Sequence, residues 1–185
     1  MTLPRGFKAQ AERQAAGVRC EWGLKPSGRL APEDLADHVK ATVVSADRLV
    51  SRESLEQLER LQAYAFSAAT FDVQGRTFIV VNPLRHDARK ASDIAHEVSH
   101  LMLQHELSEV REVEGVPFRT CRPDEEEQAT ALGGTLLLPR PFLMQAALRG
   151  DGPKAIAETY GVTLEMARYR YNATGVGRQV AHRGR

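Results

Sequence analysis

Apolar residues recur at helical spacing in several stretches of the chain. Within 89–105, Ile94, Val98, Leu101 and Met102 fall on one face of a helix, which predicts an amphipathic helix there. The same spacing, together with proline and capping signals, predicts further helices over 7–22, 32–40, 51–61, 124–138 and, as a closely spaced pair, 155–172.

Other stretches favour β-strands instead. Segments 68–73 and 76–82 are rich in β-branched and aromatic residues and flank Gln74-Gly75, a pattern typical of a β-hairpin. Residues 41–45 predict a further short strand. We therefore expect an α+β fold, mostly helical, with a small antiparallel sheet beside the helix of 89–105. The strand 76–82 can present an edge to an extended peptide, or be an ordinary core strand, and both can hold at once.

Composition narrows the class of protein. The 185 residues are 42% hydrophobic, enough for one compact core with a small appended unit. Because 25 basic residues nearly balance 24 acidic ones, the overall charge gives no argument for binding nucleic acid or a membrane surface. No run approaches the length of a membrane span, and the first residues lack a signal-peptide pattern. Cys20 and Cys121 do not make a disulfide framework, so we expect a reduced, cytoplasmic protein.

Candidate chemistry lies in the segment His96–His100, which reads His-Glu-Val-Ser-His. Two histidines four positions apart lie about 40° apart around a helix, so both imidazoles can reach one zinc ion. Glu97, between them, projects beside the metal and not onto it, where a carboxylate can take a proton from water during hydrolysis. Alternatively, His96 and His100 are two surface histidines of an amphipathic helix.

A third metal ligand is needed, and three consecutive glutamates follow Asp124 at the start of the helix of 124–138. Glu127 faces away and, three residues after Asp124, suits a capping role. Glu126 points beside the packing face and Glu125 onto it from the other side, so helical geometry favours Glu126 only slightly. All three acids also suit the first turn of a helix electrostatically.

Two motifs resemble the ImmA/IrrE family of zinc metallo-endopeptidases. The first is Ala95–His100, preceded by the strand residues Ile79–Asn82, and the second is Glu126–Pro139, which matches a later Glu-containing family segment. The resemblance covers most of residues 5–175. It implies a zincin-like fold, Zn²⁺ held by His96, His100 and Glu126, and Glu97 as the general base and acid. It further implies a helix-turn-helix transcriptional repressor as substrate, cleaved in a stress response or in the regulation of a mobile element.

The chain departs from the family pattern at three positions. Ser99 replaces a glycine, Thr130 an Asn or Asp, and Leu132 a Phe. In related zinc peptidases a side chain four residues after the ligand glutamate orients a zinc histidine. A threonine hydroxyl accepts that hydrogen bond less strongly, so the resemblance implies weaker zinc binding or activity than is usual in the family.

The C-terminal part of the chain resembles a helix-turn-helix. Residues 154–185 carry six basic and two acidic side chains, which permits contact with DNA, although the same pattern serves packing in many proteins. Peptide hydrolysis also needs a donor for the developing oxyanion, and Tyr169, Arg170 and Tyr171 are the candidates. We expect a metallopeptidase domain over 1–150, a packed helix-turn-helix-like segment over 151–175 and a disordered basic tail over 176–185.

Two hypotheses for function remain. In the first, the protein is a zinc endopeptidase with three protein ligands and a position open to water. In the second, it is a DNA-binding or antitoxin-like regulator whose zinc site is structural or vestigial. Because a structural site is normally closed by a fourth protein ligand, the second hypothesis would draw on His105 or Cys121.

Overall fold

The computed structural model describes residues 3–105, 110–113, 116–119 and 122–183. Most of these residues are helical, as expected. None of the helices within the described ranges is long and apolar enough to cross a lipid bilayer. The helices are α1 (Phe7–Glu21), α2 (Pro32–His38), α3 (Arg52–Leu61), α4 (Asp87–Met102), α5 (Pro123–Leu137), α6 (Arg140–Leu148), α7 (Pro153–Tyr160), α8 (Leu164–Thr174) and α9 (Val176–Arg183).

Three strands form a mixed sheet in the order β1-β3-β2. Their bounds are β1 (Ala41–Ser45), β2 (Ala68–Val73) and β3 (Arg76–Val81). The antiparallel pairing of β2 with β3 was expected, but β1 pairs with β3 in parallel, so the expected all-antiparallel sheet is wrong in this respect. Because β3 has a neighbour on each side, it offers no open edge to a peptide. β3 is therefore an ordinary core strand.

The β2–β3 hairpin turns on two residues in the left-handed backbone region. Gln74 has a φ of 54° and Gly75 a φ of 75°, as a two-residue hairpin turn requires. The Asp72 carboxylate accepts a hydrogen bond from the Gly75 backbone N–H at 3.0 Å. This turn fixes the register, in which Thr70 lies opposite Ile79.

A second antiparallel pair connects α4 to α5. It consists of β4 (Val110–Val113) and β5 (Val116–Arg119). The charged residues of 111–122, with Gly115 and Pro117, interrupt the apolar pattern, so these two short strands could not be expected from the sequence.

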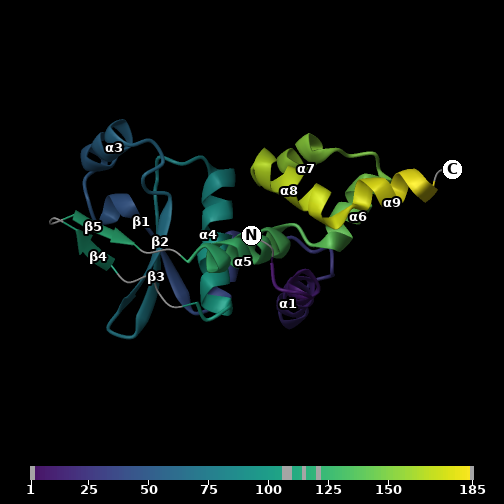
Figure 1. Cartoon of the computed structure of the whole chain (residues 1–185), viewed down its shortest axis with the longest axis horizontal. Helices are drawn as coiled ribbons and strands as arrows, with labels where there is room; N and C mark the ends of the chain where they lie inside the picture. The colour runs from purple at the N-terminus through teal and green to yellow at the C-terminus, as the bar shows by residue number, and fades with distance from the viewer. Residues whose placement is uncertain (1–2, 106–109, 114–115, 120–121, 184–185) are drawn as a thin grey trace.

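Helix α4 occupies the centre of the molecule (Figure 1). The sheet and α3 lie on one side of it, and the C-terminal helices lie on the other. Its apolar face, which includes Ile94, Ala95 and Val98, is buried. The core around these residues extends from Phe7 in α1 to Val176 in α9, and so includes residues on both sides of position 150.

We expected a disordered tail over 176–185, but residues 176–183 form the last helix, α9. Val176 is fully buried, and Val180, one turn later, packs against the core. Arg140 of α6 donates a hydrogen bond to the Gln179 side chain. Burial of apolar side chains along one face therefore orders residues 176–183, despite their basic composition.

Two buried arginines bind the C-terminal end of α5. Arg19 of α1 donates to the Leu136 carbonyl at 2.7 Å, and Arg170 of α8 donates to the Leu138 carbonyl at 3.1 Å. Terminal carbonyls of a helix lack partners within the helix and carry partial negative charge, so both contacts are favourable. Burial lowers the pKa of Arg19 to about 10, which leaves its guanidinium protonated at neutral pH.

Candidate metal centre

His96 and His100 project from successive turns of α4 toward the same point. Their Nε2 atoms lie 3.0 Å apart, and their rings meet edge to face. The helix that carries them begins at Asp87, where the His86 side chain accepts a hydrogen bond from the Arg89 backbone N–H. The structure therefore brings together the two histidines that the spacing singled out.

Glu126 completes the group from the first turn of α5. Its carboxylate oxygens lie 3.1 Å from Nε2 of His96 and 3.5 Å from Nε2 of His100. Glu125 instead forms an ion pair with Arg122 at 3.1 Å. The geometry thus distinguishes the two acids between which the sequence hardly chose.

The first turn of α5 differs from the expected capping box. The helix begins at Pro123, its N-cap is Arg122, and no side chain caps it. Asp124 therefore lies inside the first turn and is not the cap. Proline suits this position because its missing N–H would have no partner there. Glu126, also in the first turn, reaches His96 of α4.

A glycine allows α5 to approach the ligand helix closely. A Cβ at Gly133 would lie 2.9 Å from the Ala95 carbonyl oxygen and 3.1 Å from the His96 backbone nitrogen. Any larger residue would push α5 away from the turn that carries His96. The neighbouring Gly134 faces α8, where its Cβ would lie 3.0 Å from the Arg170 side chain.

The candidate ligand atoms lie close enough to bind one metal ion. Two atoms, each about 2.0–2.1 Å from a tetrahedral zinc ion, lie about 3.3 Å apart. The two Nε2 atoms lie 3.0 Å apart, Oε2 of Glu126 lies 3.1 Å from Nε2 of His96, and Oε1 lies 3.5 Å from Nε2 of His100. One ligand atom from each residue lies within 4.8 Å of the other two. Among the described residues, His96, His100 and Glu126 are the group of His, Cys, Asp and Glu side chains able to hold a metal ion. Two imidazoles and one carboxylate match the donor set of catalytic zinc sites.

The outer nitrogens of both histidines also have neighbours. The Thr130 hydroxyl lies 3.5 Å from Nδ1 of His96, the histidine contact expected of this position but at the long limit for a hydrogen bond. Nδ1 of His105 lies 3.0 Å from Nδ1 of His100. His105 thus contacts the side of the ring that faces away from the ligand group, which does not suit a fourth ligand. Cys121, the other candidate, lies outside the described residues.

Glu97 points toward the sheet side of α4. Its carboxylate accepts a hydrogen bond from the hydroxyl of Thr70 in β2 at 2.5 Å. The sequence analysis missed Thr70, because nothing in the local pattern of a strand shows which helical residue it will face. Only the register of the β2–β3 hairpin could have indicated it.

Two titratable side chains, Asp93 and Tyr169, have raised pKa values. Asp93 is buried one turn before His96, and burial raises the pKa of its carboxyl although the adjacent Arg89 opposes the shift. The Asp93–Arg89 ion pair measures 2.9 Å. Burial also raises the pKa of Tyr169 on α8; Arg170 opposes this shift, and the Glu127 carboxylate reinforces it. Tyr169 is therefore within electrostatic reach of Glu127, in the N-terminal half of α5.

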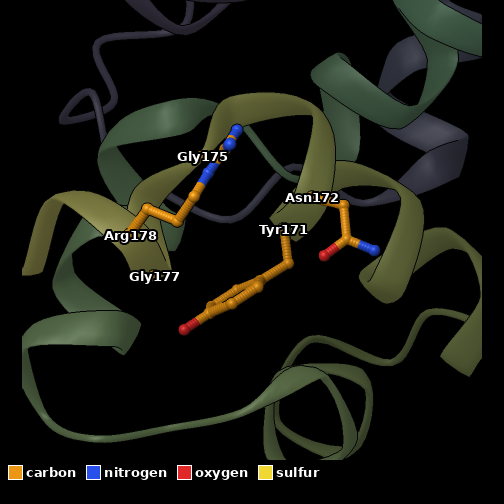
Figure 2. Close-up of a pocket in the computed structure, with 5 residues that line it drawn as sticks. All are labelled: Tyr171, Asn172, Gly175, Gly177 and Arg178. Carbon is orange, nitrogen blue, oxygen red and sulfur yellow. The ribbon is translucent and has the colours of Figure 1, made fainter. Parts of the chain in front are cut away.

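The other two oxyanion candidates serve elsewhere. Arg170 is buried and forms an ion pair with Glu12 at 2.6 Å, besides its bond to the Leu138 carbonyl. Tyr171 lines a pocket of about 210 Å³ between α8 and α9, together with Asn172, Gly175, Gly177 and Arg178 (Figure 2). Of the three candidates, Tyr169 is exposed and has Glu127 of α5 among its charged neighbours.

Two of the departures from the family pattern are buried. The Ser99 hydroxyl is satisfied by the Ala95 carbonyl at 2.7 Å, one turn back in the same helix. Leu132 is fully buried in the core. Neither side chain contacts the ligand atoms in the described interactions, so these substitutions change the packing behind the site.

Comparison with models of known protein families gives a match. The sequence model of the IrrE N-terminal-like domain, a peptidase family, matches residues 53–172, well over half of the chain. The matched stretch contains all three ligand candidates, Glu97 and Thr70. No curated protein matches the chain.

Proposed function

The chain belongs to the ImmA/IrrE family of metallopeptidases, and on that premise we propose that it is a zinc-dependent endopeptidase. The observation that carries the proposal is the convergence of His96, His100 and Glu126, with one ligand atom of each within 4.8 Å of the others and the adjacent Glu97 outside the group. A set of three protein ligands leaves a position for water and substrate, as in catalytic zinc sites.

Each residue has a distinct role in peptide hydrolysis. His96, His100 and Glu126 would hold the zinc ion. Zinc, when bound, supplies a Lewis acid that polarises the peptide carbonyl and lowers the pKa of water. Glu97 accepts a proton from the attacking water molecule, whose oxygen bonds to the carbonyl carbon. Glu97 then gives that proton to the nitrogen as the C–N bond breaks.

The substrate we propose is a helix-turn-helix transcriptional repressor, whose cleavage relieves repression in a stress response or during induction of a mobile element. The support for this substrate is the family resemblance of the two motifs, Ala95–His100 and Glu126–Pro139. Tyr169, which is exposed and has Glu127 of α5 as a charged neighbour, is the proposed donor to the developing oxyanion.

Glu97→Gln tests the proposal most directly. The variant should keep its zinc, because Glu97 is not in the ligand group, but lose cleavage of a repressor encoded beside this chain's gene. Loss of a general base costs about 100- to 10,000-fold in rate. Zinc content by elemental analysis and cleavage by gel electrophoresis are the measurements.

The experiment also separates the enzyme from the regulator. Cleavage that persists in Glu97→Gln would contradict the proposed chemistry. A zinc-loaded crystal structure with four protein ligands would favour the regulator with a structural site. Arg170, one of the six basic residues counted in the C-terminal stretch, is buried against Glu12, which leaves it unable to contact DNA.

A further inference from the structure

We propose that Thr70 is a positioning residue for Glu97, and this inference rests on the proposed function. Its hydroxyl donates to the Oε2 atom of Glu97 at 2.5 Å, across the contact between β2 and α4. The bond joins residues 27 positions apart in the sequence. It therefore depends on the folded arrangement of the hairpin and the helix.

The strand holds the Thr70 hydroxyl in a fixed place. Thr70 is 2% exposed and lies opposite the fully buried Ile79 in the β2–β3 ladder. Threonine is branched at Cβ, which restricts its side-chain rotamers. Donor and backbone are thus both rigid, as a residue that orients a catalytic group should be.

Glu97, in contrast, has a side chain that needs to be held. Glutamate rotates about three side-chain torsions, and ordering it costs conformational entropy. Among the described residues, Thr70 provides the one hydrogen bond that the Glu97 carboxylate receives. A donor bound to Oε2 fixes the rotation of the carboxylate and leaves Oε1 as the oxygen that can accept the proton of water.

The chemistry of the hydroxyl matters more than its size. A buried threonine hydroxyl could instead have bonded to a backbone carbonyl, as Thr135 does to Ala131 at 2.7 Å. Thr70 donates to the proposed catalytic carboxylate instead. Removing the hydroxyl while keeping the shape of the side chain should therefore affect catalysis without displacing the ligands.

A graded series at position 70 tests the inference. Thr70→Val keeps the shape without a donor, Thr70→Ser keeps the donor, and Thr70→Cys supplies a weak one. The assay uses a mixture of internally quenched peptides, from which the peptide cleaved by wild type but not by Glu97→Gln is chosen. For Thr70→Val we expect kcat to fall by about 10- to 100-fold. KM and zinc affinity should stay at their wild-type values. Thr70→Ser should retain most of kcat, and Thr70→Cys should lie between the two.

Thr135→Val is the matched control. Thr135 is also 2% exposed, and its hydroxyl bonds only within α5 in the described interactions. Its substitution removes the same atom from another buried threonine. If Thr70→Val reduces kcat no more than Thr135→Val does, the inference is overturned.

A measurement independent of activity distinguishes failure of this inference from failure of the proposed function. The side-chain carboxyl ¹³C signal of Glu97 can be assigned by its absence from Glu97→Gln. It should move in Thr70→Val and stay in place in Thr135→Val. A wild-type protein that cleaves no peptide would contradict the endopeptidase, while the ¹³C signal would still decide the hydrogen bond. An unmoved signal in Thr70→Val would overturn the positioning role.

Discussion

Each ligand histidine uses its two ring nitrogens differently. Nε2 of His96 and of His100 faces the ligand group, while the two Nδ1 atoms face Thr130 and His105 respectively. Outer contacts of this kind fix the orientation of the ring in metal sites. Thr130 and His105, which are not candidate ligands, therefore help to orient the rings of His96 and His100.

Glu126 and Glu125 allow a test of ligand identity at neighbouring positions. Glu126→Gln should lower zinc affinity by more than the roughly 10- to 100-fold that loss of an outer partner costs, because a ligand carboxylate becomes a poorly coordinating amide. Glu125→Gln, whose wild-type carboxylate pairs with Arg122, should leave the affinity unchanged. Competition with a chromogenic chelator measures both. Equal losses in the two variants would contradict the assignment.

Some residues of the candidate site could be predicted from the sequence, and others could not. The spacing of His96, Glu97 and His100 was sufficient because all three lie on one helix, where angular positions follow from sequence number. Thr70, and the contact of His105 with the outer nitrogen of His100, could not be predicted in this way. Thr70 comes from a strand whose placement depends on distant pairing. His105 follows the end of α4, where Gln104 adopts a left-handed backbone conformation.

The crossing of α4 and α5 assembles the site from two elements. Gly133 permits the backbones to touch beside His96, and Arg19 and Arg170 bind the far end of α5. The Glu126 helix is thus held at both its contact with α4 and its C-terminus. A shift of α5 relative to α4 would change every distance between Glu126 and the histidines.

Gly133→Ala should weaken both stability and zinc binding. Its Cβ would lie 2.9 Å from a backbone oxygen that cannot move aside, and overpacking of this kind costs about 1–3 kcal/mol of unfolding free energy. Gly17→Ala is the control, because that glycine lies in α1 with open space around it. It should raise the unfolding free energy by about 0.5–1 kcal/mol. Urea denaturation and zinc titration measure the effects; a stabilised Gly133→Ala variant would contradict the close crossing.

Helices and the hairpin were predictable because their signals are local. Ser51 does cap α3, by accepting a hydrogen bond from the Ser54 backbone N–H at 3.2 Å. The parallel pairing of β1 with β3 was not predictable in the same way, because the chain between them forms α3 and β2. Parallel strands require such a crossover, and the sequence of a strand does not reveal its partner.

The N- and C-terminal parts of the chain meet in one ionic network. Glu12 of α1 binds the Arg170 guanidinium with Oε1 and the backbone N–H of Arg140, in α6, with Oε2 at 3.0 Å. Arg170 in turn binds the end of α5. The network thereby joins α1, near the N-terminus, to α5, α6 and α8.

Arg170→Ala should destabilise the whole molecule by about 3–5 kcal/mol, because it leaves Glu12 without its buried partner. Arg168→Ala, an exposed arginine on the same helix, should change the unfolding free energy by no more than about 0.5 kcal/mol. Glu12→Ala combined with Arg170→Ala should cost less than the sum of the single variants. Additive losses in urea denaturation would show that the pair does not couple.

This network also explains why the basic C-terminal stretch was hard to interpret. A count of basic residues does not distinguish buried from exposed arginines. It therefore could not show that Arg170 is buried. Likewise, the basic residues at 176–185 concealed the apolar face of α9, which includes Val176 and Val180. Tertiary packing determined both outcomes.

The two adjacent glycines of α5 set unequal limits on how this sequence can drift. A side chain gained at Gly134 meets the arginine of α8, and a second substitution that shortens that arginine could restore the fit. One gained at Gly133 meets the main chain of Ala95, and no replacement of any neighbour removes a main-chain atom. Evolution can therefore compensate for change at one position but has no such remedy at the next.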